Sequence, residues 1–311
     1  MRALAVDMGG THISCGAVDD QTLLDVVSIE SNSRGGLQGL LPILADTLAT
    51  LSKKHGGNFA GIGLGFCGLV DTGASRVVST NHKYADATSV DIVTWARETL
   101  GLRLVLENDT RMALLGEWHA GAANGSDDVV MITLGTGIGS AVIMEGALLR
   151  GKHFQAGCLG GHFTVVLDGR RCSCGARGCF EAEASTDALP EVCKSWPGFE
   201  TSPLTHEEKL DFATVFGWAE RGDPIATAIR DRSVSIWAAC ALSLVHAYDP
   251  EVFVVGGGVM KSSFPILAAL QRHVDSYAWA PWGKVRFCQS KLGDGAALLG
   301  AVPLIKMHSI E

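Results

Sequence analysis

The chain has 311 residues, of which 47% are hydrophobic and 19% are charged. These values predict one large domain or two ordinary ones with a sizeable core, and they exclude long disordered stretches. The net charge of −8 argues against a general nucleic-acid binder, because affinity for the phosphate backbone comes from Lys and Arg. The N-terminal apolar stretch is short and interrupted by Asp7, and no window approaches about 18 uninterrupted apolar residues. We therefore expect a soluble, cytoplasmic protein without a membrane segment.

The first half of the chain alternates apolar runs with helical patterns. Two short strands are expected around a glycine turn, followed by a helix, a buried third strand, a second helix, a fourth strand and a third helix. Their ranges are 3–6, 13–18, 37–54, 59–66, 90–100, 104–106 and 110–118.

The second half repeats the opening pattern. Strands at 129–134 and 138–144 flank another glycine turn, and a helix at 224–247, a strand at 252–255 and a closing helix at 294–306 follow. Alternation of strands and helices predicts an α/β fold. The recurrence of strand, glycine turn and strand indicates a weak internal repeat, one copy in each of two lobes.

Three glycine-rich segments follow predicted strands: Asp7-Met8-Gly9-Gly10-Thr11, Gly135-Thr136-Gly137 and Gly256-Gly257-Gly258. Glycine lets backbone N–H groups approach a phosphate closely because it has no Cβ. Asp7 is a candidate for holding Mg²⁺. Taken alone, each segment is more typical of an ordinary tight turn, but three of them after buried strands favour a nucleotide site.

Cys172, Cys174 and Cys179 lie within eight residues, and His162 lies ten residues upstream. One His and three Cys form a closed set of ligands of the kind that structural zinc prefers. The alternative is three ordinary reduced cysteines.

Glu107-Asn108-Asp109 follows a predicted strand and opens a helix. A carboxylate at this point can accept a proton from a substrate hydroxyl in phosphoryl transfer. Taken alone, the segment is more typical of a helix cap than of a catalytic base.

In this order, the motifs resemble the ROK family (repressors, open reading frames and kinases) of the hexokinase and actin-like superfamily. The resemblance covers nearly the whole chain and includes Gly65-Phe-Cys-Gly68-Leu-Val-Asp71. The zinc pattern is its most specific part.

The resemblance implies an actin-like, ribonuclease H-like two-lobed ATPase fold with a structural zinc loop. The small lobe is expected at 1–120, completed by a C-terminal helix at 294–311, and the large lobe at 121–293. It also implies ATP, Mg²⁺ and Zn²⁺ as cofactors, a homodimer, and no nucleic-acid or membrane partner. Because the chain starts at the first phosphate strand, we do not expect the helix-turn-helix of a ROK repressor.

The resemblance implies specific roles for residues of the site. Asp109 is the expected general base. The expected nucleotide contacts are Asp7, Gly9, Gly10, Thr11, Gly135, Thr136, Gly137, Gly256, Gly257 and Gly258. The expected sugar contacts, between the lobes, are Gly68, Asn81, Asn108, Asp109, His162, Glu181 and Glu183. The expected zinc ligands are His162, Cys172, Cys174 and Cys179.

One departure from the family pattern bears on substrate. Leu159 stands where most sugar kinases of the family have a Glu, three residues before the zinc His. Glu183 is a possible replacement, and a surface charge is its alternative interpretation. The expected function is an ATP-dependent kinase for a hexose or hexose derivative. The alternative is a catalytically weak or inactive sugar-binding or regulatory ROK protein.

Overall fold

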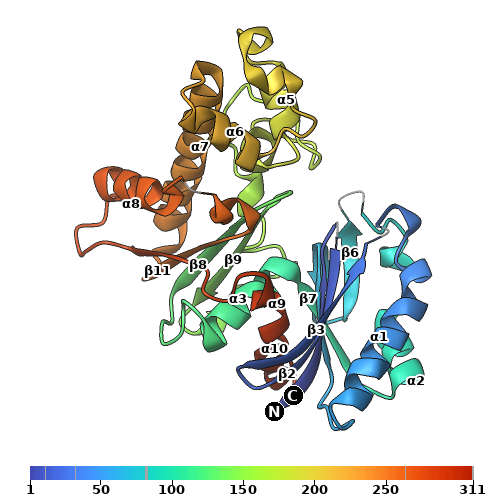
Figure 1. Cartoon of the computed structure of the whole chain (residues 1–311). Coiled ribbons are helices and arrows are strands. Elements are labelled where there is room, and N and C mark those ends of the chain that lie inside the picture. The colour runs from blue at the N-terminus through green and yellow to red at the C-terminus, as the bar shows by residue number, and fades with distance from the viewer. Residues whose placement is uncertain (11, 32, 81–82, 263, 310–311) are drawn as a thin grey trace. The chain divides into compact units, whose positions relative to one another are not determined.

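The computed structural model describes residues 1–10, 12–31, 33–80, 83–262 and 264–309, and the chain forms two compact units (Figure 1). Unit 1 comprises Met1–Ser126, Leu148–Cys158 and Ser290–Glu311, and unit 2 comprises Asp127–Ala147 and Leu159–Gln289. The segment 148–158, expected in the large lobe, thus belongs to unit 1.

Unit 1 is built on a five-stranded sheet in the order β3-β2-β1-β4-β7. Its strands are β1 (Arg2–Met8), β2 (His12–Asp19), β3 (Thr22–Glu30), β4 (Ile62–Phe66) and β7 (Leu104–Asn108). Strands β1, β2 and β3 pair antiparallel, whereas β1, β4 and β7 pair parallel. A hairpin of β5 (Gly68–Asp71) and β6 (Arg76–Thr80) follows β4.

Helices cover both faces of this sheet. Helices α1 (Leu41–Lys54) and α2 (Ile92–Leu100) lie on one face, and α3 (Asp109–Ala120), α9 (Ala296–Leu299) and α10 (Ala301–Met307) on the other (Figure 1). In α1, Leu44, Leu48 and Leu51 recur at helical spacing and are buried in the core.

The predicted closing helix at 294–306 is interrupted, which corrects the expectation of one continuous element. The structure has a 3₁₀ turn at Gly293–Gly295, then α9, then α10 after Gly300. A Cβ on Gly300 would overlap the carbonyl oxygen of Met112, and one on Gly116 would overlap that of Ala296. This close approach of α3 to the C-terminal segment requires glycine at both positions.

Unit 2 contains a second five-stranded sheet in the order β10-β9-β8-β11-β12. Its strands are β8 (Val129–Leu134), β9 (Ile138–Met144), β10 (Ala147–Leu148), β11 (Val252–Gly256) and β12 (Arg286–Gln289). Strands β8 and β9 are antiparallel, and β8, β11 and β12 are parallel. The two sheets therefore have corresponding strand orders, and the directions of β9, β8, β11 and β12 match those of β2, β1, β4 and β7, which confirms the predicted internal repeat.

The remaining helices of unit 2 are α4 (Phe180–Ala184), α5 (Leu189–Lys194), α6 (Phe212–Glu220), α7 (Pro224–Tyr248) and α8 (Ile266–Tyr277). Helix α7 begins where the Asp223 side chain accepts a hydrogen bond from the Ala226 N–H, with Pro224 in the first turn. The buried Trp237 of α7 packs edge-on against Phe212 of α6 with ring centroids 4.9 Å apart.

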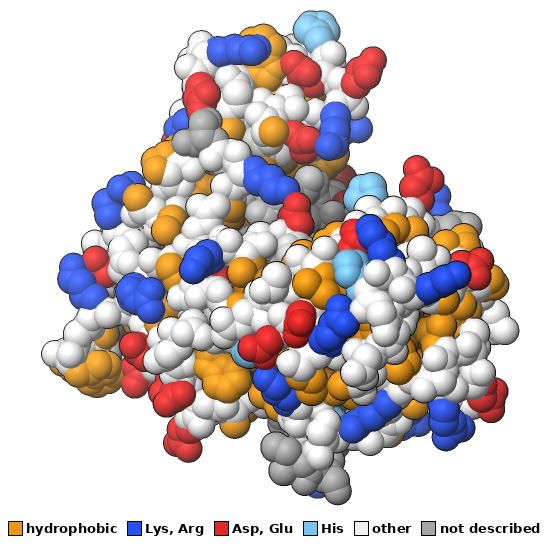
Figure 2. All heavy atoms as spheres, turned by 60° about the horizontal axis from the view of Figure 1, so that its bottom comes forward, with side chains coloured by type: hydrophobic (Ala, Val, Ile, Leu, Met, Phe, Trp, Pro, Cys, Tyr) orange, Lys and Arg blue, Asp and Glu red, His pale blue; other side chains and the backbone are white. Residues whose placement is uncertain are grey.

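No helix among the described residues has the length and apolar character needed to cross a membrane. On the face shown in Figure 2, basic and acidic side chains are interspersed rather than gathered into areas of one sign.

Candidate functional site

The carboxyl ends of the parallel strands of unit 1 bring the predicted acidic residues together. Asp7, next to the last residue of β1, lies opposite Gly65 of β4, and Asn108 at the end of β7 lies opposite Phe66. Ligands of open α/β sheets bind beyond such strand ends. The fold thus places Asp7 and Asp109 at one edge, although about a hundred residues separate them in the sequence.

Asp109 is the first residue of α3, and hydrogen bonds to one of its two carboxylate oxygens orient the side chain. Oδ1 accepts hydrogen bonds from the Thr110 N–H at 2.7 Å and from the Asn108 side-chain amide at 2.9 Å. Among the described residues, Oδ2 has no hydrogen-bond partner. The N-cap of α3 is Asn108, whose side-chain oxygen accepts from the Arg111 N–H at 3.1 Å. Capping therefore does not require Asp109.

Both carboxyls have raised pKa values. Burial raises the pKa of Asp109 to about 6, against the opposing effects of the Thr110 hydrogen bond and the charge of Lys83. Burial, followed by the negative charges of Asp109 and Asp294, raises the pKa of Asp7 to about 7. A general base works best with a pKa near the operating pH, and such perturbed carboxyls concentrate at functional sites.

Glu107, the first residue of the predicted catalytic segment, is instead surrounded by arginine side chains. Its carboxylate is fully buried, accepts a hydrogen bond from Nε of Arg150 at 2.8 Å and lies 3.5 Å from Nη1 of Arg111. The Arg111 guanidinium also donates to the carbonyl oxygens of Phe154 at 3.0 Å and Ala156 at 2.6 Å. This network fastens the loop 150–156 to the end of β7. Sequence reasoning missed it because the partners lie about forty residues apart.

The first glycine turn is held from the side by a residue that the sequence motifs did not identify. The Tyr84 hydroxyl donates to the Gly9 carbonyl oxygen at 2.8 Å and lies 2.7 Å from Oγ of Ser31. That Oγ lies 3.2 Å from the carbonyl oxygen of Gly10. Burial raises the pKa of Tyr84 to about 12, so its hydroxyl keeps the proton that it donates.

The other two glycine segments meet at one edge of the unit 2 sheet. Gly256, at the end of β11, lies opposite Thr133 of β8, and β8 leads into Gly135. Gly257 has a φ of 93°, and a Cβ there would overlap the carbonyl of Leu134. Glycine is therefore required at 257 for both conformation and space.

Glu181 on α4 reaches the second glycine turn. Its Oε2 accepts a hydrogen bond from the Ile138 N–H at 2.8 Å, and a Cβ on Gly137 would lie 2.6 Å from the same oxygen. The short 3₁₀ helix Gly160–His162 packs there too, because Gly161 lies against the backbone of Ile138. Unit 2 thus brings His162, Glu181 and the 135–137 turn together.

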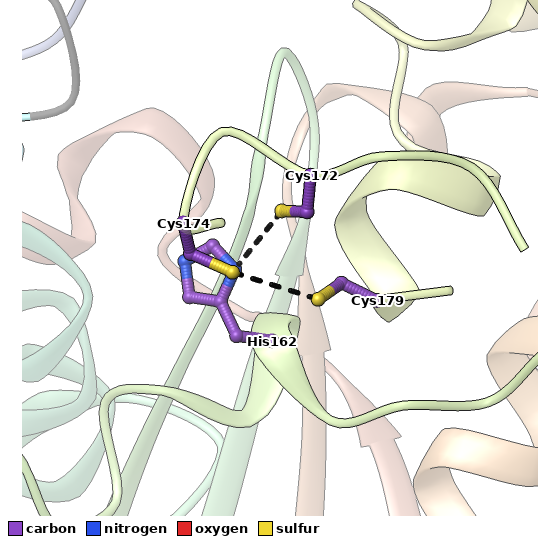
Figure 3. A group of neighbouring side chains, drawn as sticks. All are labelled: His162, Cys172, Cys174 and Cys179. Atoms are coloured by element: carbon purple, nitrogen blue, oxygen red, sulfur yellow. Dashed lines mark hydrogen bonds between the residues drawn. The ribbon is translucent and has the colours of Figure 1, made fainter. Parts of the chain in front are cut away.

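His162, Cys172, Cys174 and Cys179 converge as Figure 3 shows, with one ligand atom of each within 4.8 Å of all the others. Sγ of Cys172 lies 3.5 Å from Nδ1 of His162, and Sγ of Cys174 lies 3.6 Å from Sγ of Cys179. Tetrahedral zinc with Zn–S bonds of about 2.3 Å has ligand–ligand edges of about 3.8 Å. The spacing is therefore compatible with a zinc site.

The chemistry of the donor set fits a cation as well. Burial and the neighbouring Cys174 and Cys172 sulfurs raise the pKa of the Cys179 thiol to about 12. A positive ion at the centre would favour the deprotonated sulfurs, because thiolates at this distance otherwise repel one another. The turn that presents them uses Gly175 and Gly178 at φ of 95° and 66°, and the Gly175 N–H donates to the Cys172 carbonyl at 3.0 Å.

Glu183 is a buried residue that contacts Arg170, just before the cysteine loop. It is 1% exposed, its carboxylate accepts a hydrogen bond from the Arg170 N–H at 2.6 Å, and it pairs with the guanidinium of Arg232. These contacts argue for a role in holding the loop, and they exclude the alternative interpretation of a surface charge.

The sequence matches the model of the ROK family over residues 3–308. The chain belongs to the ROK family. It is 31% identical to a glucokinase of Thermotoga maritima over 313 residues, which cover 98% of each protein. Xylose repressors and an N-acetylmannosamine kinase are also among its relatives.

Solved ROK structures share the fold. The ROK hexokinase of Thermus thermophilus superposes with a TM-score of 0.84 at 30% identity, covering 100% of this chain and 99% of that one. A ROK glucokinase of Streptomyces griseus in complex with glucose and AMPPNP has a TM-score of 0.83 at 28% identity, covering 99% and 100%. The chain therefore has the mixed α/β, actin-like fold of the ROK sugar kinases, as the sequence resemblance implied.

Two residues expected from the ROK resemblance, Thr11 and Asn81, lie outside the described residues. Within unit 1, Gly68 accepts a hydrogen bond from the Asn108 side chain at 3.2 Å, which ties the β5 hairpin to the start of α3. The dimer expected from the resemblance stays a prediction.

Proposed function

We propose that this ROK protein is an ATP-dependent sugar kinase that transfers the γ-phosphoryl group of MgATP to a hydroxyl of a hexose or a close hexose derivative. The observation that carries the proposal is the Asp109 carboxylate. Hydrogen bonds to its Oδ1 hold it at the carboxyl end of β7, and burial raises its pKa to about 6. The similarity to glucokinases, one of them solved with glucose and AMPPNP, supports the same reaction.

In the proposed step, the carboxylate of Asp109 accepts the proton of the attacking hydroxyl. The sugar oxygen forms its bond to the γ-phosphorus while the bond from that phosphorus to the bridging oxygen breaks, and ADP leaves with the electron pair. Phosphoryl transfer needs positioning and charge compensation more than covalent help from the protein. Asp7 would hold the Mg²⁺ that accompanies the nucleotide, and the N–H groups of the turns at 9–11 and 135–137 would bind phosphate oxygens.

The remaining roles follow from the chemistry of each group. The Gly256–Gly258 segment would accommodate adenosine, and Asn108, with Asn81 and Gly68, would bind sugar hydroxyls. His162 faces the sulfur of Cys172 with Nδ1, so zinc binding through Nδ1 leaves Nε2 for a sugar hydroxyl. Glu181 would contact the sugar as well. Zinc would fix the loop that carries these groups rather than take part in the transfer.

The test is ADP release from MgATP across a panel of hexoses, N-acetylhexosamines, ketoses and polyols. We expect strong turnover with at least one of them, and we expect Asp109→Asn to lower kcat by at least 100-fold with sugar affinity by calorimetry nearly unchanged. Asp46→Asn, which changes an exposed carboxylate on α1, is the matched control and should retain full activity. Full activity of Asp109→Asn would refute the assignment of the base.

The second candidate is a sugar-binding regulator with little or no turnover. Leu159 in place of the usual Glu favours it, as does the presence of xylose repressors among the relatives. Sugar binding by calorimetry without ADP release above the rate with ATP alone would support the regulator and contradict the kinase.

A further inference from the structure

Lys83 lies beside the first glycine turn and the candidate base, and no motif assigns it a role. A Cβ built on Gly10 would lie 2.6 Å from Cε and 2.8 Å from Cδ of Lys83, so the end of the lysine side chain lies over the glycine. Its charge also acts on Asp109 at the start of α3 and on the thiol of Cys67 after β4. The side chain of Lys83 thus lies against the Gly10 turn, and its charge acts on two other elements of unit 1.

The backbone on the C-terminal side of Lys83 is firmly fixed. Tyr84 is fully buried, adopts a φ of 53°, and donates its N–H to the Ser33 carbonyl at 2.7 Å and its hydroxyl to Gly9 at 2.8 Å. Asp86 accepts hydrogen bonds from the N–H groups of Leu37 and Gln38 at 2.6 and 2.9 Å. Tyr84 thus ties the backbone next to Lys83 to the glycine turn, and Asp86 ties it to the segment 37–38.

The groups around Lys83 at this edge include several carboxyls. Asp7 and Asp109 are both carboxylates in a desolvated place, and the negative charge of Asp294 also acts on Asp7. Among the described residues, no carboxylate forms an ion pair with Lys83. An ammonium group that lies beside a phosphate-binding turn without an ion-pair partner retains its hydrogen-bond donors for a ligand oxygen.

We propose that Lys83 is a further catalytic residue, whose ammonium group donates to the non-bridging oxygens of the transferred γ-phosphoryl group. The inference rests on the proposed kinase function, because it places the γ-phosphate between the Gly9–Gly10 turn and Asp109. Lys83 keeps its proton throughout the step and offsets the negative charge that spreads over the phosphoryl oxygens as the bond to ADP breaks. The hydroxyl proton still goes to Asp109.

The test compares Lys83→Met, Lys83→Arg and the control Lys53→Met, an exposed lysine at the end of α1. Calorimetry measures the affinities for Mg-AMPPNP and Mg-ADP, and steady-state kinetics separates kcat from the KM for sugar. We expect Lys83→Met to lower kcat about 100-fold and AMPPNP affinity about 10-fold while ADP affinity is unchanged. Lys83→Arg should recover most of the AMPPNP affinity because it keeps the charge, and Lys53→Met should resemble the wild type.

Two results would overturn the proposal. One is a Lys83→Met variant with wild-type kcat and wild-type AMPPNP affinity. The other is a raised KM for sugar with kcat and AMPPNP affinity intact, which would place the ammonium group on the acceptor instead. If the wild type phosphorylates no sugar, the kinase proposal fails, but the difference between AMPPNP and ADP binding still decides whether Lys83 contacts a γ-phosphate. Equal melting temperatures of the variants exclude a folding defect as the cause.

Discussion

Replacing the candidate base should make the protein more stable at neutral pH. Burial raises the pKa of Asp109 from its ordinary value of 3.8 to about 6 in the folded chain. Each pKa unit corresponds to about 1.4 kcal/mol, so ionised Asp109 disfavours folding by about 3 kcal/mol. Asn at this position carries no charge, and its Oδ1 can still accept the hydrogen bond from the Thr110 N–H. We expect Asp109→Asn to gain about 1–3 kcal/mol at pH 8.

The sign of the pH dependence follows from linkage. A carboxyl with a raised pKa binds more protons in the folded state than in the unfolded state between about pH 4 and pH 6. The stability of the wild type therefore falls as the pH rises through this window, and the advantage of the variant grows. By the same arithmetic, that advantage should be about half as large at pH 5 as at pH 8 and nearly absent below pH 4.

Thermal unfolding followed by circular dichroism at pH 8, 5 and 3.5 measures this difference. One kcal/mol changes the melting temperature of a domain of this size by about 2–4 °C, so the variant should melt several degrees higher at pH 8. Asp46→Asn should show no such pH-dependent gain, since Asp46 is exposed. An Asp109→Asn variant that is less stable than the wild type at pH 8, or equally stabilised at every pH, would refute the reasoning.

Two further predictions concern the base and the metal. Asp109 must be ionised to accept a proton, and its pKa is about 6. We therefore expect kcat/KM for sugar to rise with pH and to level off above about pH 7. A profile that is flat down to about pH 4.5 would argue against a buried carboxyl base. The His162 and cysteine cluster should retain about one zinc per chain, measured by atomic emission, and Cys179→Ser should lose the metal and melt lower. Cys193→Ser, at a buried cysteine outside the cluster, should keep the zinc; equal zinc content in Cys179→Ser would contradict the site.

Several features of this protein could be predicted from the sequence without a structure. The alternation of apolar runs and helical patterns predicted the α/β class, and the repeated strand, glycine turn and strand predicted the duplicated sheet topology. The spacing of Cys172, Cys174 and Cys179 predicted the convergence with His162, because a turn of eight residues already holds three of the four ligands close together. These are properties of neighbours in the chain, and local sequence determines them directly.

Tertiary structure decided which of the charged residues are enclosed by ion-pair partners and which keep an oxygen available for a ligand. Glu107 and Asp109 lie two residues apart, yet one is enclosed by Arg111 and Arg150, and the other has an oxygen without a described hydrogen-bond partner. Glu183 looked available in the sequence and is buried against Arg232. Only packing brings these distant partners together, since a side chain's partners depend on the fold.

The same holds for Lys83 and for the closing helix. Lys83 belongs to no local motif, and its place over Gly10 depends on the buried contacts of Tyr84 with the first glycine turn. The close approach of α3 requires glycine at 300, between α9 and α10, and hydrophobic periodicity does not encode this requirement. Sequence by itself determined the fold class, the glycine turns and the metal pattern, because these depend on residues near one another. The pKa values and the orientation of the base depend on desolvation and on partners from distant segments, and only the folded chain decides them.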